Sequence, residues 1–433
     1  MLTAAGLAHL LGAESAPVTA AITGVAFDTR YVQPGDAFFA LPGATTHGIQ
    51  FAEQALAKGA VCIISDQPHE LGMVVHDPAQ ALLTLGRLAR KRLTGPVIGI
   101  TGSVGKTTTR VATEAALAGT GTPGNYNTPL ALSQTLFRAY AQQELHGPKP
   151  LVLELGIDHV GEMATLVHLT KPDHAVLTTI GHSHLAGLGD IATVAREKIG
   201  LLANVPGLTL ASLQTAPWVP RELQAGITFV TVTEPVGPLP TTPPHLVHGR
   251  LRGNTLYALD QEVALPHAGF GVAHAALLGL VLAQQLQIPT AEAAARIAAA
   301  PWEGGRLERL RVGNLLVLND SYNSNPLSVA EAAHVLFQEP GEKHVVFGTM
   351  AELGNRSVAE HETAAKLLAD AASVALVGEP TKAMLGLLPQ ATYFADVHEL
   401  LAGYTWPTSG TLLIKGSRSV QLERAVAALL EHA

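Results

Sequence analysis

The segment that most constrains the fold of this chain is Ile98–Thr109, with the sequence IGITGSVGKTTT. The apolar run Val97–Thr101 predicts a buried strand, and a glycine turn and a helix from about Gly105 follow it. Gly102 and Gly105 let the backbone curl, so that successive N–H groups and the helix N-terminus point at phosphate oxygens. We therefore predict a nucleotide phosphate loop made by Gly102, Ser103, Val104, Gly105, Lys106, Thr107 and Thr108.

The side chains of this loop have separate expected tasks. Lys106 is expected to contact the β- and γ-phosphates, and the Thr107 hydroxyl to bind Mg²⁺. The usual pattern has glycine where Ile100 stands, so this is a shortened variant. The alternative is an ordinary strand–helix turn, which the residue order and the flanking strand disfavour. The loop alone leaves kinase, ATPase, GTPase and ligase open, although we find no guanine-reading or switch motif of a GTPase.

Composition limits the remaining possibilities. A chain of 433 residues with 47% hydrophobic and 14% charged residues is expected to fold into roughly three units of about 150 residues. The net charge of −8 argues against nucleic acid as the main partner. No apolar run reaches the ~20 residues of a membrane span, and the first 16 residues do not resemble a secretory signal, so we expect a cytoplasmic protein. Cys62 is the single cysteine, which excludes an intramolecular disulfide, and its apolar neighbours predict an inert core thiol.

The hydrophobic pattern also indicates the organisation of the chain. Leu151–Leu155 and Ala175–Ile180 read as parallel strands separated by helices, and Leu277–Gln287 reads as a helix. A further α/β unit begins near Trp302. We predict an α/β protein of three domains: a small α/β N-terminal domain (1–93), a central doubly wound P-loop ATPase domain (94–301) and a Rossmann-like C-terminal domain (302–433).

Other short segments accompany the phosphate loop in a fixed order. They are Phe27–Arg30, Glu154–Gly156, Gly181–Leu185, Ala195–Lys198, Gly305-Arg306, Asn319–Pro326, Met350–Gly354 and Lys415–Ser419. Each is a weak signal by itself. Taken together, at these spacings, they resemble the Mur ligase family over nearly the whole chain.

The resemblance implies an ATP-dependent ligase that converts a carboxylate into an acyl phosphate and couples it to an amine, forming a peptide bond in cell-wall precursor synthesis. The segments around Tyr322 and Met350 favour the branch that adds D-Ala-D-Ala to UDP-N-acetylmuramoyl-tripeptide, acting as a monomer. Thr349 and Phe270–His274 depart from the family pattern beside the amine and adenine. A related ligase that adds another amino acid, or a nonenzymatic ATP-binding scaffold, are therefore the alternatives.

By the same resemblance, Lys106, Glu154, His184 and Lys198 are the catalytic residues. Mg²⁺ would be held by Thr107, Glu154, His184 and Lys198, with Lys198 converted by CO₂ into a carbamate. Considered without the family, the structural explanations are preferred. Glu154 is then a solvated carboxylate at a strand end, His184 a polar loop histidine and Lys198 a surface lysine paired with an acid.

The remaining expected contacts also follow from the resemblance. Arg306 and Asp320 would contact the phosphate and ribose of ATP, and Asn323 would line the nucleotide region. A planar guanidinium suits phosphate because it donates two hydrogen bonds at once. The uridine diphosphate substrate would be bound by Thr29, Arg30 and Asn127.

Overall fold

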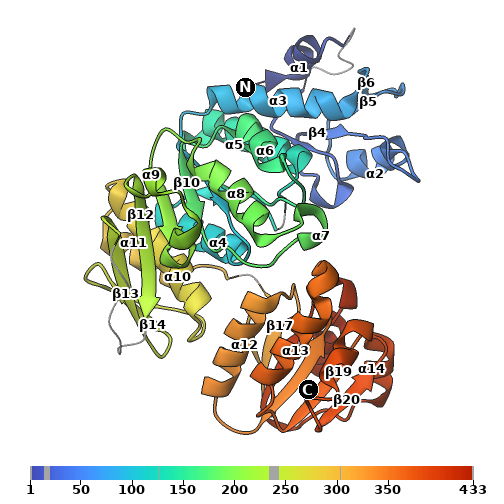
Figure 1. The fold of residues 1–433 in the computed structure, drawn as a ribbon. Helices are drawn as coiled ribbons and strands as arrows, with labels where there is room; N and C mark the ends of the chain where they lie inside the picture. Colours follow the sequence, from blue (N-terminus) through green and yellow to red (C-terminus); the bar gives the residue numbers. More distant parts are fainter. Residues whose placement is uncertain (1, 14–19, 125, 234–242, 303, 432–433) are drawn as a thin grey trace.

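The computed structural model describes residues 2–13, 20–124, 126–233, 243–302 and 304–431, and Figure 1 shows three α/β bodies in chain order. Within these ranges the strands form sheets of four, nine and six strands, spanning residues 24–74, 97–264 and 308–415. The two-stranded ribbon of β1 (Leu2–Thr3) and β2 (Ala21–Ile22) precedes them. The predicted α/β class with three units is therefore confirmed, and the predicted boundaries at 93/94 and 301/302 fall between the sheets.

The N-terminal body is a parallel sheet flanked by short helices. Its strand order is β3 (Gly24–Ala26), β4 (Asp36–Phe39), β5 (Cys62–Ser65) and β6 (Gly72–Val74), with α1 (Ala4–Leu11) and α2 (Ala52–Ala57) beside it. As predicted, Cys62 is buried, and burial raises the pKa of its thiol to about 12. The helix α3 (Pro78–Arg92) begins where Asp77 accepts hydrogen bonds from the next backbone N–H groups, and it ends in basic residues that suit its C-terminal dipole.

The central body is built on the nine-stranded sheet, and most of its neighbouring strands are parallel. The antiparallel pairs join β13, β14 and β15 at one edge. In spatial order the strands are β15 (Gln261–Ala264), β14 (Thr255–Ala258), β13 (Leu246–Arg252), β12 (Ile227–Thr233), β11 (Thr209–Ser212), β10 (His174–Leu177), β7 (Val97–Thr101), β9 (Leu151–Glu154) and β8 (Thr120–Gly121).

Alternate residues of the central strands enter two different cores. Ile98 and Val152 pack with one layer, formed by α4 (Lys106–Leu117), α10 (Phe270–Gln285) and α11 (Thr290–Ala298). Val97 and Leu153 pack with the other, which contains α5 (Pro129–His146), α6 (Glu162–Thr170), α7 (Leu185–Leu188) and α8 (Ile191–Leu202). Because successive strand residues point to opposite faces, continuous apolar strands require helices on both sides. This is the predicted doubly wound arrangement, and Figure 1 shows α4 and α10 close together in it.

The C-terminal body is a six-stranded sheet between two helical layers. Its strand order is β16 (Glu308–Val312), β17 (Asn314–Asp320), β21 (Ser409–Lys415), β18 (Lys343–Gly348), β19 (Ser373–Val377) and β20 (Ala391–Phe394), parallel except for β16 with β17. The core on one face includes residues of α12 (Pro326–Gln338) and α13 (Ser357–Leu367); the core on the other includes α14 (Val397–Gly403) and α15 (Glu423–Glu431). This layering confirms the Rossmann-like prediction.

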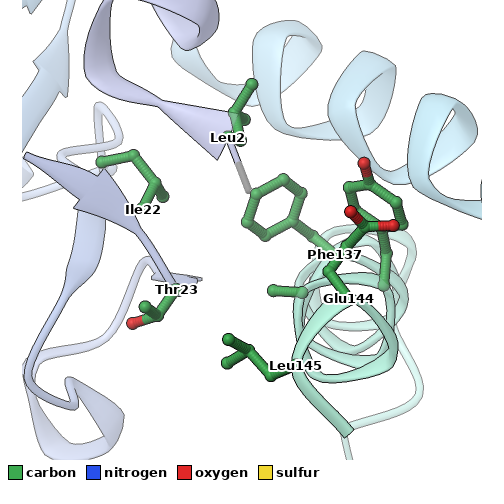
Figure 2. A pocket seen from close by; sticks show the side chains of 8 residues that line it. Leu2, Ile22, Thr23, Phe137, Glu144 and Leu145 are labelled. Atoms are coloured by element: carbon green, nitrogen blue, oxygen red, sulfur yellow. The ribbon is translucent and has the colours of Figure 1, made fainter. Parts of the chain in front are cut away.

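The N-terminal and central bodies are joined tightly. Figure 2 shows Phe137 and Leu145 of α5 facing Leu2 and Ile22 of the ribbon, around a gap of about 10 Å³. Such a gap has room for about one water molecule, so the joint is packed core and not a ligand site. On the same helix, Arg138 forms an ion pair with the buried Asp36.

Candidate active site

A cleft of about 610 Å³ lies between the central and C-terminal bodies, at the carboxyl ends of β7, β9 and β10. In open parallel sheets this edge is where ligands bind, because the strand-end loops converge there. The cleft brings together most of the predicted nucleotide and metal residues, and its lining includes Ser103, Val104, Gly105, Lys106, Thr107, Thr108, Asn127, Glu154, His184, Arg306, Asp320 and Asn323.

The phosphate loop has the predicted context of strand, turn and helix. Gly102 has a φ of 154° and Gly105 a φ of 83°. A Cβ on Gly102 would lie 1.9 Å from Thr178 Oγ1, so only glycine fits this turn. Lys106 Nζ donates to the Gly102 carbonyl at 2.9 Å, and the helix α4 begins directly after Gly105. The backbone amides of the loop and the N-terminus of α4 can therefore face one anion.

The strand predicted to reach Ile180 ends earlier, at Leu177, because the next two residues bond to the phosphate loop. Thr178 Oγ1 donates to the Val104 carbonyl at 2.5 Å. Thr179 Oγ1 accepts from the Val104 N–H at 2.9 Å, and the Thr179 carbonyl accepts from the Ser103 N–H. These bonds from the neighbouring strand end hold the loop in its curled conformation, and no local sequence pattern predicts them.

Thr107 is the point at which the two sides of the cleft meet. Its hydroxyl donates to Glu154 Oε2 at 2.8 Å, from the end of the adjacent strand β9. Arg306 Nη2, from the C-terminal side, donates to the same Thr107 oxygen at 2.9 Å, and its guanidinium carbon lies 4.0 Å from the ring centre of Tyr322. A hydroxyl, a carboxylate and a guanidinium thus converge beside the phosphate loop.

These groups suit Mg²⁺, which takes one or two protein oxygens and completes its shell with water and phosphate. The adjacent oxygens of Thr107 and Glu154 meet that requirement. In the part of the chain that the structure describes, no three His, Cys, Asp or Glu side chains form a ready-made metal cluster.

Lys198 lies on α8, whose first turn is capped by Asp190, because the Asp190 side chain accepts from the Thr193 N–H. It is fully buried, and among the described residues its Nζ has no hydrogen-bond partner. Burial, and then the charge of Lys106, hold the pKa of Lys198 well below its ordinary value, while Asp158 opposes them. The interpretation of Lys198 as a surface lysine is therefore wrong, because the side chain is fully buried, and burial disfavours its charged form.

His184 follows β10 and has a left-handed backbone, with φ of 54°. Its Nδ1 lies 2.8 Å from Asp158 Oδ1 and 2.6 Å from Glu352 Oε2, the latter from the C-terminal side. Nearby, His182 Nδ1 lies 3.1 Å from Glu360 Oε1 of α13. The loop after β10 is therefore a second place where the two bodies touch.

Asp320 already has partners within the C-terminal body. Its Oδ2 lies 2.6 Å from Nζ of the fully buried Lys415, and its Oδ1 accepts from the Leu307 N–H at 3.2 Å. Lys415 Nζ also donates to the carbonyl of Asn323, whose side chain accepts from the Ser324 N–H. Asp320 lines the cleft, but both of its oxygens are committed to the fold in this arrangement.

The segment Phe270–His274, expected beside adenine, forms the first turn of α10, which therefore begins before the predicted Leu277. His274 is turned away from the cleft, because its ring nitrogens bond to the Phe270 carbonyl and the Val232 N–H. The cleft is lined here instead by His267, Gly271, Trp302 and Glu331. Burial lowers the pKa of His267 to about 4, so its imidazole is uncharged near neutral pH.

The predicted uridine diphosphate contacts lie on two different surfaces. Asn127 is in the cleft, where its side chain packs against Gly156. Thr29 Oγ1 donates to Gln54, and Arg30 pairs with Asp28 and lines a separate cavity of about 550 Å³. The ring of Tyr126 contacts Phe27 and Tyr31, so these two surfaces adjoin.

Asp158 and Glu352 were not predicted as site residues, although the sequence held a signal for each. Asp158 comes four residues after Glu154, in the loop of the same strand end. Glu352 is in the Met350–Gly354 segment, one of the segments that carry the family resemblance. Strand-end loops of neighbouring parallel strands meet, so both carboxylates were candidates.

Comparison with known proteins identifies relatives along the whole chain. Residues 21–84 match the catalytic domain of the Mur ligase family, residues 100–218 match the Mur ligase middle domain, and residues 305–418 match the Mur ligase glutamate ligase domain. The UDP-N-acetylmuramoyl-tripeptide–D-alanyl-D-alanine ligase of Treponema pallidum is 31% identical, covering 93% of this chain and 92% of the relative. The enzyme of that name from Escherichia coli is 29% identical, covering 100% and 99%.

Solved structures agree with these matches. A crystal structure of MurF from Acinetobacter baumannii superposes with a TM-score of 0.80 at 28% identity, covering 99% of this chain and 98% of that one. MurF ligase from Thermotoga maritima in complex with ADP, at 24% identity and a TM-score of 0.75, shares the fold. Within the described ranges of this chain, no helix is long and apolar enough to cross a membrane.

Proposed function

Since this chain belongs to the Mur ligase family, we propose that it joins D-Ala-D-Ala to UDP-N-acetylmuramoyl-tripeptide at the expense of ATP, in peptidoglycan precursor synthesis. A carboxylate is a poor electrophile, because its charge is delocalised and its oxygen leaves badly. In the first step a carboxylate oxygen of the tripeptide attacks the γ-phosphorus of ATP, and ADP leaves. In the second step the amine of D-Ala-D-Ala attacks the acyl carbon and gives up a proton, and inorganic phosphate leaves.

The chain supplies positioning and positive charge for the first step. The phosphate loop would hold the β- and γ-phosphates, with Lys106 and Arg306 facing the charge that the reaction moves toward ADP. Asn127, which also lines the cleft, would orient the tripeptide. Closing the cleft between the two bodies also excludes water, which would otherwise hydrolyse the acyl phosphate.

Mg²⁺ is the metal that the residues of this site would hold. Thr107 and Glu154 would hold one ion, and His184 with Lys198 a second. When bound, the metal neutralises the phosphate charge and aligns the reacting oxygens. The deprotonated amine of Lys198 is the form that reacts with CO₂, and the carbamate so formed would be a buried anion beside the charge of Lys106. A carbamate carbon signal in NMR of the protein under ¹³CO₂, absent in Lys198→Met, would support this assignment; its absence in the wild type would contradict it.

One observation carries the proposal most directly: Arg306 of the C-terminal body donates to Thr107 of the phosphate loop, which bonds in turn to Glu154. A scaffold that only bound ATP would need the loop but would not need this second body to reach the γ-phosphate position. A ligase needs both, because the second body must close over the nucleotide and the acceptor.

The second candidate function is a related ligase that adds another amine. Thr349 favours it, since the family has aspartate there, and its Oγ1 bonds only weakly, at 3.4 Å, to the Val377 carbonyl. The two functions can be distinguished by measuring ADP release from the purified protein with ATP, UDP-N-acetylmuramoyl-tripeptide and one amine at a time. ADP release that requires D-Ala-D-Ala supports the first; release with L-Glu or another single amino acid instead supports the second.

The cellular setting follows from the substrates. ATP and uridine-linked precursors belong to the cytoplasm, which is the proposed compartment. A monomer is the proposed active unit, as the resemblance to the family implies. Residues 1–93, 94–301 and 302–433 are the proposed domains for substrate binding, ATP binding and closure.

A further inference from the structure

Two residues with left-handed backbones face each other across the cleft. His184 has φ of 54° and Glu352 has φ of 63°, and the distance from His184 Nδ1 to Glu352 Oε2 is 2.6 Å. Residues other than glycine rarely adopt this conformation, which costs about 1–3 kcal/mol and persists only where surrounding structure enforces it. Two such residues in direct contact, one from each body, point to a shared task.

The backbone on both sides of this contact is held by further hydrogen bonds. On the central side, Ser103 Oγ of the phosphate loop bonds to both the N–H and the carbonyl of Gly181, at 3.0 Å each. On the C-terminal side, the Ala351 N–H donates to Ser417 Oγ at 2.8 Å and the Met350 N–H donates to His361 Nε2 at 3.1 Å. The contact is thus made between two braced turns.

Asp158 completes the surroundings of this imidazole, with Oδ1 2.8 Å from the same Nδ1. The two carboxylates share the nitrogen, and neither is aligned with it as a regular hydrogen bond. An unprotonated Nδ1 would place a lone pair against two anions, which is repulsive. A neutral imidazole carries one proton, so the proton belongs on Nδ1 and the free lone pair on Nε2.

Building on His184 as a proposed ligand of the second Mg²⁺, we propose that Glu352 is a positioning residue that fixes His184 with Nε2 ready to bind metal, and only when the C-terminal body is docked. Metal-binding histidines usually donate their other N–H to a carboxylate, which sets the tautomer and the ring orientation. Here one such carboxylate comes from the same body as His184 and the other from the opposite body. Docking of the C-terminal body is therefore coupled to completion of the metal site.

The adjacent contact fits this arrangement. His182, two residues before His184, lies 3.1 Å from Glu360, whose side chain is 9% exposed and also pairs with Arg356. Leu327 of α12 packs close above Gly181, where a Cβ would approach its side chain to 2.3 Å. Several contacts therefore hold the C-terminal body against the loop after β10, and the contact between Glu352 and His184 is one of them.

The test uses Mn²⁺ as the probe for the metal site, measured by EPR on the full chain with and without ADP. With ADP present, Glu352→Gln should weaken Mn²⁺ binding about 10-fold, in the range typical of a lost carboxylate partner. If the two bodies separate without ADP, the effect of Glu352→Gln should shrink there, because Glu352 then no longer reaches His184. Asp158→Asn should weaken binding in both states. Glu362→Gln, an exposed neighbour on α13, serves as the matched control and should behave as the wild type.

A direct reading of the imidazole needs no variant. In ¹⁵N-histidine NMR of the wild type with ADP and Mg²⁺, His184 should show its proton on Nδ1. A proton on Nε2 would overturn the proposal. An unchanged Mn²⁺ affinity of Glu352→Gln with ADP would also overturn it. If His184→Ala binds Mn²⁺ as tightly as the wild type, the metal role of His184 itself is wrong. Ligation of D-Ala-D-Ala by the wild type tests the proposed function separately.

Discussion

The buried ion pair between Asp320 and Lys415 gives a prediction that can be worked out in numbers. Asp320 ends β17 and Lys415 ends the neighbouring β21, at the C-terminal wall of the cleft. The Lys415 side chain is 0% exposed and the Asp320 side chain 12%. The perturbation is Asp320→Asn, which keeps the size of the side chain and an acceptor for the Leu307 N–H.

The expected cost follows from what the substitution leaves behind. The new amide would present an N–H donor to an ammonium group that is out of water, and the carbonyl of Asn323 would be the remaining acceptor for it. Removing one partner of a buried pair costs about 3–5 kcal/mol, because the other charge loses its compensation. Since a domain is stable by about 5–15 kcal/mol, the C-terminal body should lose a large fraction of its free energy of unfolding.

Urea unfolding without ATP measures this loss apart from any contact with ribose. A background of Trp218→Phe and Trp302→Phe leaves Trp406, in the C-terminal body, as the fluorescence probe. Adding Lys415→Met to Asp320→Asn removes the stranded charge and should recover most of the loss. A cost below about 1 kcal/mol for the single variant, or no recovery in the double variant, would refute the reasoning.

Further predictions concern the loop, the cleft and pH. Gly102→Ala places a methyl group against Thr178 and should lower the free energy of unfolding, measured by urea titration, by about 2–4 kcal/mol. The control is Gly253→Ala, because Gly253 also has a left-handed backbone but open space around an added methyl group. This control should cost about 1–2 kcal/mol in the same titration. Arg306→Lys loses the planar fork, so kcat/KM for ATP should fall about 10- to 100-fold; an unchanged value would sink the role assigned to Arg306. The pKa of His267 is lowered to about 4 in the native chain. Between about pH 4 and 6.5, the His267 imidazole is therefore protonated in the unfolded chain but not in the native chain. The free energy of unfolding should fall as the pH drops through that window. His267→Gln lacks this effect, so the difference in unfolding free energy between wild type and variant should change by about 2 kcal/mol from about pH 7 to about pH 4.5; no change would contradict the burial argument.

Much of the architecture was predictable from local pattern. Val97–Thr101 and Leu151–Leu155 are continuous apolar runs, which only a sheet covered on both faces can bury. The prediction that a strand ends at Ile180 was wrong, because the side chains of Thr178 and Thr179 form hydrogen bonds with the phosphate loop. Such hydrogen bonds depend on a partner about 75 positions away, and no local pattern reveals them.

The candidate site was predictable in its residues but less so in their partners. Lys106, Thr107 and Glu154 lie together because strand-end loops of neighbouring strands converge. Lys198 looked like a surface lysine, since nothing in its helix indicates that a second helical layer and the sheet cover it. Glu352 reaches His184 only through the docking of two bodies, and such a contact exists in the tertiary structure alone.

The most direct test of the central claim, that a carboxylate is activated by the γ-phosphate of ATP, follows oxygen atoms through one turnover. UDP-N-acetylmuramoyl-tripeptide carrying ¹⁸O in its terminal carboxylate is incubated with the protein, ATP and D-Ala-D-Ala, and the released phosphate is analysed by mass spectrometry. Attack of the carboxylate on the γ-phosphorus predicts that one ¹⁸O from each tripeptide appears in inorganic phosphate, together with ADP and the pentapeptide product. Unlabelled phosphate, or release of AMP and pyrophosphate, would contradict it.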